Sequence, residues 1–331
     1  MKPHQKAAYL QLLTLNSLDE ILSEFQLGNL LSGPNRNDGN NNSFFVETDN
    51  GKFQVKSYVK SEENPEYYAT QVMREIAFTT FLFERKFLVQ QHLSFQPFLY
   101  NGLVTTITSY LEGKTIQPSS SDHDIPQKLG KLIGELHLAS CDFGKGGATF
   151  EQRNSFREKV SEQLANITAV VGVEERRINE IINTYNTLRQ EKSEVASELP
   201  KGLIHNEITP HHVLKGAEND LLLIDFEGTK FTLLVADFGQ TFQTFFYTEN
   251  EGYNTQQVRS FLKSYETVRE LSEREYSWLG QELRYNYYHK LEWRMLAMLS
   301  NEGYIPIVKT MIENMDRFEE QVAELRKELP R

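Results

Sequence analysis

The spacing of hydrophobic residues changes once along this chain, and that change constrains the fold more than any other feature. Up to about residue 112, segments such as NSFFVET and KFQVKSYV alternate apolar and polar residues, which is typical of strands with one buried face. After the Ser-rich segment 118–124 the spacing approaches four residues, which indicates helices. The pattern predicts an α+β protein with a small β-rich lobe, residues 1–112, and a larger, mostly helical lobe, residues 113–331.

The β-rich part predicts five strands and one main helix. Three strands are expected in FQLGNLLS, NSFFVET and KFQVKSYV, with a polar loop at 33–43 between the first two. Asp49-Asn50-Gly51 predicts a tight hairpin, because Asn and Gly tolerate positive φ. Residues 63–87 are expected to form a helix, and PFLY and LVTTITSY two further strands. Beyond them, helices are predicted at 128–140, 150–171, 174–198 and from about 255 onward.

Composition and charge narrow the class of protein. The 331 residues exceed what one hydrophobic core usually supports, so two lobes with a ligand cleft are expected. The formal net charge of -11 disfavours nucleic acid or an anionic membrane as a partner. No apolar run reaches about 18 residues, and the N-terminus has no signal-peptide pattern, so a cytoplasmic protein is expected. Cys141 is the only cysteine, which excludes an internal disulfide and a cysteine-rich zinc site.

The stretch HNEITPHHVL, residues 205–214, carries the chemistry and lies between the short apolar segments GLIH and LLLID. Three histidines and a carboxylate so close together are typical of transition-metal ligands. His205-Asn206-Glu207 followed by Pro210 also matches the start of a zinc-deaminase signature, but that signature needs two cysteines, which this chain lacks. A helical His-Glu-x-x-His zinc motif is absent as well. A metal-hydrolase site is therefore the weaker interpretation.

The same stretch resembles the catalytic loop of the protein-kinase-like phosphotransferases that act on small molecules. This group includes aminoglycoside phosphotransferases, choline kinases, type II homoserine kinases and spore-coat kinase-like proteins. Its loop is His-x-Asp-x-x-x-x-Asn, followed by two apolar residues and a strand that ends in Ile-Asp-Phe. The corresponding segments here are His205-x-Glu207-x-x-x-x-His212-Val213-Leu214 and Leu223-Ile224-Asp225-Phe226-Glu227.

The resemblance covers roughly residues 24–245. It implies a bilobal protein-kinase-like fold with a small β-rich N-lobe and a larger helical C-lobe. It also implies an ATP-dependent transfer of the γ-phosphoryl group to a hydroxyl of a small molecule, assisted by Mg²⁺, with Mn²⁺ as an alternative.

Two aspartates compete for the metal-binding role. Asp237 belongs to an Asp-Phe-Gly triplet like that of protein kinases, but it is 30 residues after Glu207, whereas Asp225 is 18 residues after it and ends the strand LLLI. Because a strand end is a rigid platform for a ligand, Asp225 is the expected metal ligand. The resemblance implies that Glu207 is the catalytic carboxylate, that His212 takes the second metal position, and that His205 and Asp237 support the loop.

Nucleotide-binding residues are expected in the β-rich lobe. Lys56 lies in KFQVKSYV with its apolar neighbours on the opposite face, so it can face a cleft. The resemblance implies that Lys56 positions the phosphates and that Glu75, on the following helix, is its partner. It also implies nucleotide contacts from the loop before the second strand and from the end of the fifth strand, at Asn42, Ser43, Ser109 and Leu111.

Two residues of the loop depart from the family pattern. Glu207 replaces an aspartate, and a displacement of about 1 Å in a catalytic group can cost on the order of a hundredfold in rate. His212 replaces an asparagine, whose amide oxygen suits Mg²⁺, whereas imidazole suits Mn²⁺, Zn²⁺ or Cu²⁺ better. Two functions therefore stay open. One is an active phosphotransferase, and the other is a pseudokinase that binds nucleotide or a partner protein without efficient turnover.

The acceptor pocket is expected on the C-terminal helices, and an amino-alcohol, a sugar or an aminoglycoside-like molecule is the expected substrate class. Aromatic and acidic residues there form either a wall for a cationic or sugar-like acceptor or, as the favoured interpretation, an aromatic helical core. These residues are Tyr285, Tyr287, Tyr288, Glu292 and Trp293.

Overall fold

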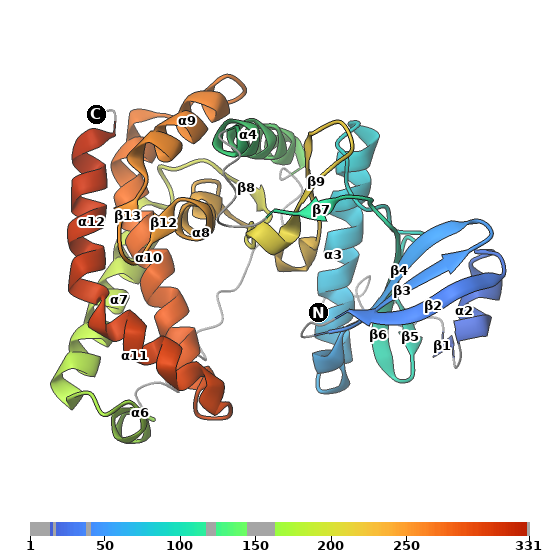
Figure 1. Cartoon of the computed structure of the whole chain (residues 1–331), viewed down its shortest axis with the longest axis horizontal. Coiled ribbons are helices and arrows are strands. Elements are labelled where there is room, and N and C mark those ends of the chain that lie inside the picture. The colour runs from blue at the N-terminus through green and yellow to red at the C-terminus, as the bar shows by residue number, and fades with distance from the viewer. Residues whose placement is uncertain (1–13, 16–17, 38–40, 117–123, 144–162, 330–331) are drawn as a thin grey trace. The chain divides into compact units, whose positions relative to one another are not determined.

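A computed structural model of the chain describes residues 14–15, 18–37, 41–116, 124–143 and 163–329 (Figure 1). Contacts divide the chain into two compact units, Met1–Thr115 with Leu214–Thr229, and Ile116–Val213 with Lys230–Arg331. The lobe boundary after residue 112 stays a prediction. Among the helices that the structure describes, none combines the length and the apolar character needed to cross a membrane.

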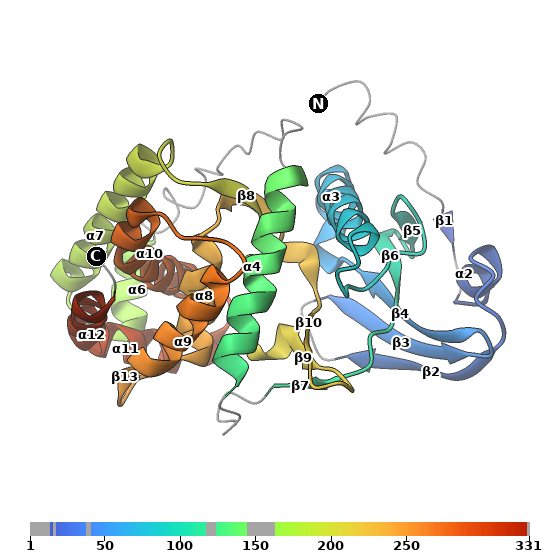
Figure 2. The same cartoon turned by 90° about the horizontal axis from the view of Figure 1, so that it is seen from above.

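The described part of the first unit contains a six-stranded sheet in the order β1-β5-β6-β4-β3-β2 (Figures 1 and 2). Its strands are β1 (Thr14–Leu15), β2 (Leu30–Asn37), β3 (Asn42–Thr48), β4 (Gly51–Ser57), β5 (Phe98–Tyr100) and β6 (Leu103–Ser109). β1 runs parallel to β5, and the other neighbours are antiparallel. Thr48 pairs with Gly51 across the β3–β4 turn, which confirms the predicted hairpin.

The start of this sheet corrects two expectations. The sequence predicts a strand in FQLGNLLS, but helix α2 (Leu18–Glu24) precedes it and β2 begins only at Leu30. Residues 33–37, expected to be part of a loop, belong to β2. Their backbone pairs with β3 through two register shifts, so tertiary pairing overrides the turn-forming composition of the segment.

Helices cover both faces of the sheet. Helix α3 (Pro65–Glu84) lies within the predicted helical segment, and the side chain of Asn64 accepts a hydrogen bond from the N–H of Tyr67 as its N-cap. Buried residues of α3 pack with Tyr58 and Val104, whereas those of α2 pack with the opposite sheet face. Because side chains alternate along a strand, α3 covers the face to which Lys56 belongs.

The second unit is mostly helical (Figures 1 and 2). Its longer helices are α4 (Ile125–Phe143), α6 (Leu164–Val171), α7 (Glu175–Val195), α8 (Ala236–Phe245), α9 (Thr255–Glu266), α10 (Glu273–Ala297), α11 (Ile305–Glu313) and α12 (Met315–Glu328). These elements confirm the predicted helices, except that residues 150–162 lie outside the described residues. Gly130 allows α4 to approach α9 closely, because a Cβ there would lie 2.2 Å from the carbonyl oxygen of Phe261.

Short strands present the sequence motif. β8 (Lys201–Ile204) pairs antiparallel with β11 (Lys230–Leu233), and the predicted catalytic loop follows β8 directly. The loop ends in a 3-10 turn, Pro210–His212, that leads into β9 (Val213–Lys215). β9 lies between β7 (Lys114–Thr115) and β10 (Leu221–Leu223). The strand predicted in LLLID is therefore present as β10, and Asp225 follows its end.

Candidate active site

The first candidate cluster surrounds Lys56 on β4. The Nζ atom of Lys56 lies 2.5 Å from Oδ1 of Asp225 and 2.6 Å from Oε2 of Glu227. Burial opposes the charge of this ammonium, but Tyr58 and the two carboxylates hold the pKa of Lys56 well above its ordinary value. Two carboxylates thus share one protonated amine, and the cluster keeps an excess of negative charge.

Asp225 and Glu227 reach Lys56 because of the backbone that follows β10. Asp225 has a φ of 66°, in the left-handed region that few residues other than glycine adopt. The next residue, Phe226, is buried and its ring meets that of Phe78 on α3. Asn41 donates a hydrogen bond of 2.7 Å to Oε2 of Glu227. No role was predicted for Glu227, although a second carboxylate two residues after Asp225 was a usable signal.

Glu75 is buried on α3 and has partners that the sequence did not predict. The hydroxyl of Tyr58 donates to Oε2 of Glu75 at 2.7 Å, and Nε2 of His92 lies 3.7 Å from Oε1. Burial raises the pKa of Glu75 to about 7, against the charge of Lys56, and burial lowers the pKa of His92 to about 4. Among the described residues, the ion pairs of Lys56 go to Asp225 and Glu227 rather than to Glu75.

The residues predicted to cover the phosphates lie on β3 rather than in a loop. Ser43 stands opposite Lys56 in the β3–β4 pairing, and Asn42 stands opposite Ser57. The hydroxyl of Ser43 accepts a hydrogen bond of 2.5 Å from Nε2 of Gln54. Ser43 is therefore adjacent to Lys56 on the same sheet.

Ser109 and Leu111, the two residues predicted to contact the base, differ in their backbone hydrogen bonds. The N–H of Ser109 donates to the carbonyl of Gln91 at 2.8 Å, and its hydroxyl accepts from the N–H of Gln91 at 3.0 Å. The backbone of Leu111 makes no hydrogen bond to any residue that the structure describes. Leu111, rather than Ser109, thus offers an N–H that a ligand can use.

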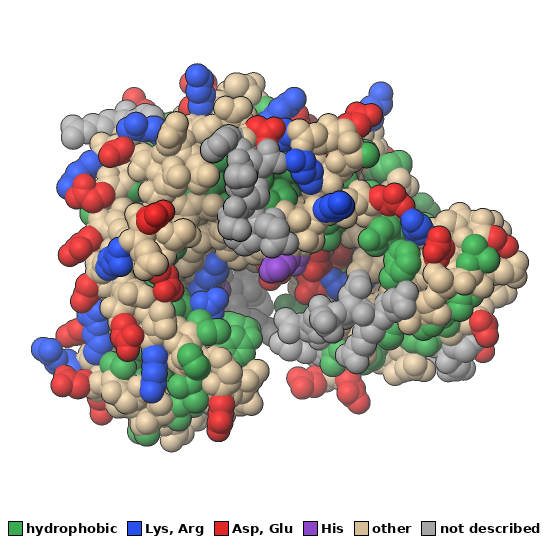
Figure 3. Space-filling model, viewed as in Figure 1, with side chains coloured by type: hydrophobic (Ala, Val, Ile, Leu, Met, Phe, Trp, Pro, Cys, Tyr) green, Lys and Arg blue, Asp and Glu red, His purple; other side chains and the backbone are tan. Residues whose placement is uncertain are grey.

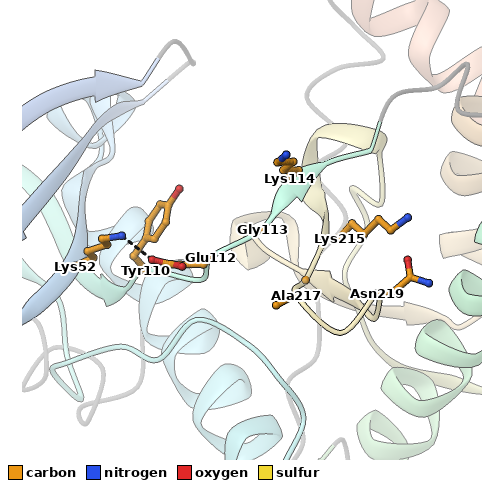
Figure 4. A pocket seen from close by; sticks show the side chains of 9 residues that line it. Lys52, Tyr110, Glu112, Gly113, Lys114, Lys215, Ala217 and Asn219 are labelled. Atoms are coloured by element: carbon orange, nitrogen blue, oxygen red, sulfur yellow. Dashed lines mark hydrogen bonds and ion pairs between the residues drawn. The ribbon is translucent and has the colours of Figure 1, made fainter.

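An open pocket of about 650 Å³ flanks this segment within the first unit (Figure 4). Lys52 and Glu112 form an ion pair of 2.6 Å on one side, and Figure 4 shows Lys215 and Asn219 from the β9–β10 turn on the other side. The ring of Tyr110 meets Phe45 edge to face at 4.9 Å. Charged side chains and the ring of Tyr110 both line the pocket, which borders residues 110 and 112–114.

The second candidate cluster is the loop at residues 205–212 of the second unit, and Asp237 holds it in place. Asp237 is fully buried at the start of α8. Its carboxylate accepts hydrogen bonds from the N–H groups of His205, at 3.1 Å, and Asn206, at 2.7 Å. Nε2 of His137 lies 3.0 Å from the same carboxylate, and Nδ1 of His137 lies 2.9 Å from the hydroxyl of Tyr265.

Glu207 and His212 are bonded to each other through the backbone of the loop. Nδ1 of His212 lies 2.7 Å from the carbonyl oxygen of Glu207. A carbonyl only accepts, so Nδ1 carries the proton, and the lone pair that could bind a metal is on Nε2. The side chains of both residues are partly exposed. Within the described ranges, no group of three or more His, Cys, Asp or Glu side chains is placed to hold a metal ion.

The aromatic residues of α10 form core rather than one continuous wall. Tyr287 stacks on Phe318 with ring centroids 4.0 Å apart, and its hydroxyl donates to the carbonyl of Met311. Tyr288 and Glu292 are buried as well, whereas the side chain of Trp293 is 42% exposed. The favoured interpretation, an aromatic helical core, is confirmed for Tyr287 and Tyr288.

Comparisons with known proteins agree on one group. The model of the phosphotransferase enzyme family matches residues 34–271. A homoserine kinase from Afipia carboxidovorans is 24% identical over 290 residues, which is 84% of each chain. A microcompartment-associated aminopropanol kinase superposes with a TM-score of 0.66 at 14% identity, over 92% of this chain and 98% of that one. An amicoumacin kinase solved with AMP-PNP and Ca²⁺ superposes with a TM-score of 0.61 at 13% identity, over 100% and 97%. These likenesses confirm the predicted α+β, protein-kinase-like fold.

Proposed function

The chain belongs to the phosphotransferase enzyme family, and from that premise we propose that it transfers the γ-phosphoryl group of ATP to a hydroxyl of a small molecule. The observation that carries the proposal is the cluster of Lys56, Asp225 and Glu227, with ion pairs of 2.5 and 2.6 Å. Homoserine and aminopropanol, named in two of the relatives, both carry an amine and a hydroxyl, which supports an acceptor of that kind, and homoserine carries a carboxylate as well.

The residues around Lys56 fit a nucleotide bound with a divalent cation. Carboxylate oxygens are hard ligands of the kind that Mg²⁺ and Mn²⁺ prefer. The side chains of Asp225 and Glu227 are 30% and 31% exposed, so a cation can reach them. When bound, the cation would offset the charge of the phosphates. Asp225 is the proposed metal ligand, and Nε2 of His212 is proposed for a second metal position.

The chain's own residues would then perform three tasks. Lys56 positions the phosphates, with Glu75 buried behind it and Asn42 and Ser43 on the neighbouring strand. The backbone of Leu111 binds the base. Glu207 accepts the proton of the acceptor hydroxyl while the acceptor oxygen bonds to the γ-phosphorus and ADP leaves.

Asp237 and His205 act by positioning. Because the carboxylate of Asp237 fixes two consecutive N–H groups of the loop, it fixes the backbone on which Glu207 stands. This pre-organisation is the main contribution that a protein makes to phosphoryl transfer.

The test is a thermal-shift screen of ATP with Mg²⁺, Mn²⁺ or Zn²⁺, followed by assays of ADP release with amino-alcohols, sugars and aminoglycosides. We expect a metal-dependent rise in melting temperature with ATP, and ADP release that Asp225→Ala abolishes. Asp142→Ala, an exposed aspartate on α4, is the matched control and should leave both readouts unchanged. No stabilisation by any combination would contradict the proposal.

The departures at Glu207 and His212 support a second candidate, a pseudokinase that binds nucleotide or a partner protein without efficient turnover. The double variant Glu207→Asp, His212→Asn separates the two candidates. If the parent is inactive and the double variant releases ADP, the pseudokinase is correct. Ready activity in the parent would exclude it.

A further inference from the structure

Basic side chains gather near the loop in the second unit, although the chain has a formal net charge of -11. Four of them lie close enough to His289 for their charges to act on its ring, namely Arg189, Lys192, Lys230 and Lys290. Figure 3 shows Lys and Arg side chains beside α8 and α10. Nδ1 of His289 lies 2.8 Å from the hydroxyl of Tyr185, and burial together with these charges lowers the pKa of His289 to about 3. This group, called the basic cluster below, lies entirely within the second unit.

Most members of the basic cluster have a partner in the protein. Lys192 pairs with Glu282 at 2.5 Å and lies 3.9 Å from the ring centre of Tyr285. Lys290 donates to the side-chain carbonyl of Gln243 at 2.8 Å. Lys230 differs from them, because its ammonium makes no hydrogen bond or ion pair with any residue that the structure describes.

Lys230 is the member nearest in register to the predicted catalytic loop. It is the first residue of β11 and pairs with Ile204, the residue before His205. The charge of Glu207 acts on its ammonium. Burial, together with the neighbouring charge of Lys192, lowers the pKa of Lys230 to about 8, so the amine is still mainly protonated at pH 7.

A partly buried ammonium that makes no ion pair or hydrogen bond with the described residues is unfavourable, and a bound anion would relieve that cost. Three carboxylates act on Lys230 through their charge, namely Glu282, Asp237 and Glu207. Glu282 is paired with Lys192, Asp237 accepts the N–H groups of the loop, and Glu207 is the proposed catalytic carboxylate. A cationic acceptor would meet repulsion from the basic cluster, whereas an anionic one would be attracted.

We propose that Lys230 binds an anionic group, a carboxylate or a phosphate, that the acceptor carries close to the hydroxyl to be phosphorylated. The proposal rests on the proposed function and narrows its substrate class from amino-alcohols in general to hydroxy acids or hydroxyalkyl phosphates. The charge of Lys192, which acts on Lys230, adds to the positive charge around that group. Lys230 is thus a specificity-determining residue and takes no part in the chemical step.

The test uses acceptor pairs that differ only in the anionic group. Homoserine is compared with 3-aminopropan-1-ol, threonine with 1-aminopropan-2-ol, and glycerol 1-phosphate with glycerol. Binding to the full chain is measured by calorimetry with and without AMP-PNP and Mn²⁺, and kcat/KM is measured with ATP. We expect at least one acid or phosphate to bind about tenfold or more tightly than its neutral or cationic counterpart.

Variants of Lys230 test whether this residue causes the preference for the anionic acceptor. Lys230→Met should remove that preference, and Lys230→Arg should retain most of it, because Arg keeps the charge. Lys201→Met is the matched control, since Lys201 is exposed on the same pair of strands and should leave the preference unchanged. The homoserine and glycerol pairs show whether a carboxylate or a phosphate is bound.

The inference is overturned if no acid or phosphate in the set binds better than its counterpart, or if Lys230→Met leaves the preference intact. It is also overturned if Lys230→Met weakens AMP-PNP binding by the same factor, since Lys230 would then contact the nucleotide. Failure of the proposed function has a different signature, namely no binding of AMP-PNP by the parent chain.

Discussion

Asp225 and Asp237 stand twelve positions apart and both follow apolar segments, yet their surroundings are opposite. Asp225, in the first unit, has a left-handed backbone, a side chain that is 30% exposed, and an ion pair with Lys56. Asp237, in the second unit, is fully buried and accepts hydrogen bonds from two backbone N–H groups, with His137 beside it. Asp237 carries the Asp-Phe-Gly letters, but Asp225 has the environment of a ligand.

The difference shows how to separate a structural carboxylate from one that can bind a ligand. The oxygens of Asp237 accept hydrogen bonds from backbone N–H groups of the loop, and these bonds break only if the loop unfolds. The partner of Asp225 is the side chain of Lys56, which in the proposed function binds the phosphates. Access to solvent and a side-chain partner therefore favour Asp225 over Asp237 as the proposed metal ligand, against the motif letters.

The largest expected effect is on activity at Asp225. Asp225→Asn should lower kcat by about 1,000-fold, because the amide lacks the charge that a divalent cation needs. Asn tolerates the left-handed backbone, so the melting temperature should change little. Steady-state assays and thermal melts check both parts. A variant that keeps parental activity would remove Asp225 from the proposed site.

The complementary experiment is at Asp237. Asp237→Ala leaves two buried N–H groups unbonded, so the free energy of unfolding should fall by about 3 kcal/mol. Denaturant titration measures this loss, with the exposed Asp142→Ala as the matched control. Unchanged stability would mean that the carboxylate does not hold the loop, and would contradict the structural role that separates Asp237 from Asp225.

The next effect in size is expected on kcat, from a substitution in the loop at residues 205–212. If Glu207 is the working carboxylate, the site is built around its longer side chain, and Glu207→Asp should lower kcat by about a hundredfold. Glu218→Asp, in the exposed turn between β9 and β10, is the control. A rise in kcat would instead indicate a degenerate loop, as the pseudokinase candidate requires.

The smallest effect is on the pH dependence of stability at Glu75. Its folded pKa, about 7, lies above the ordinary value of 4.5, so the protonated form stabilises the fold below pH 4.5 and that stabilisation is lost as pH rises to about 7. The loss is at most about 3.5 kcal/mol, at about 1.4 kcal/mol per pKa unit.

Glu75→Gln isolates this contribution, because the amide does not titrate. His92, whose pKa is lowered to about 4, acts in the opposite direction between about pH 4 and 6.5 and partly masks the parental slope. The free energy of unfolding of the parent minus that of Glu75→Gln should therefore fall from pH 4.5 to 7. A difference that stays constant with pH would contradict the burial argument.

Local pattern determined much of the fold. Alternation and turn residues placed β3, β4, β5 and β6, and helical spacing placed α3, α4, α7 and the C-terminal helices. The loop predicted at residues 33–37 was wrong. Gly, Pro and Asn favour a turn in isolation, but pairing with β3 makes this segment a strand. Chain order also did not indicate that Leu214–Thr229 groups with the first unit.

The sequence by itself determined which residues could do chemistry, through the loop register and the strand that ends before Asp225. Only the tertiary structure decided who their partners are. Lys56 meets Asp225 and Glu227 across 169 residues or more, Glu75 meets Tyr58, and Lys230 makes no ion pair with any residue that the structure describes. The reason is physical. Periodicity is a property of neighbouring residues, whereas an ion pair or an uncompensated charge depends on which distant segments the packed core brings together.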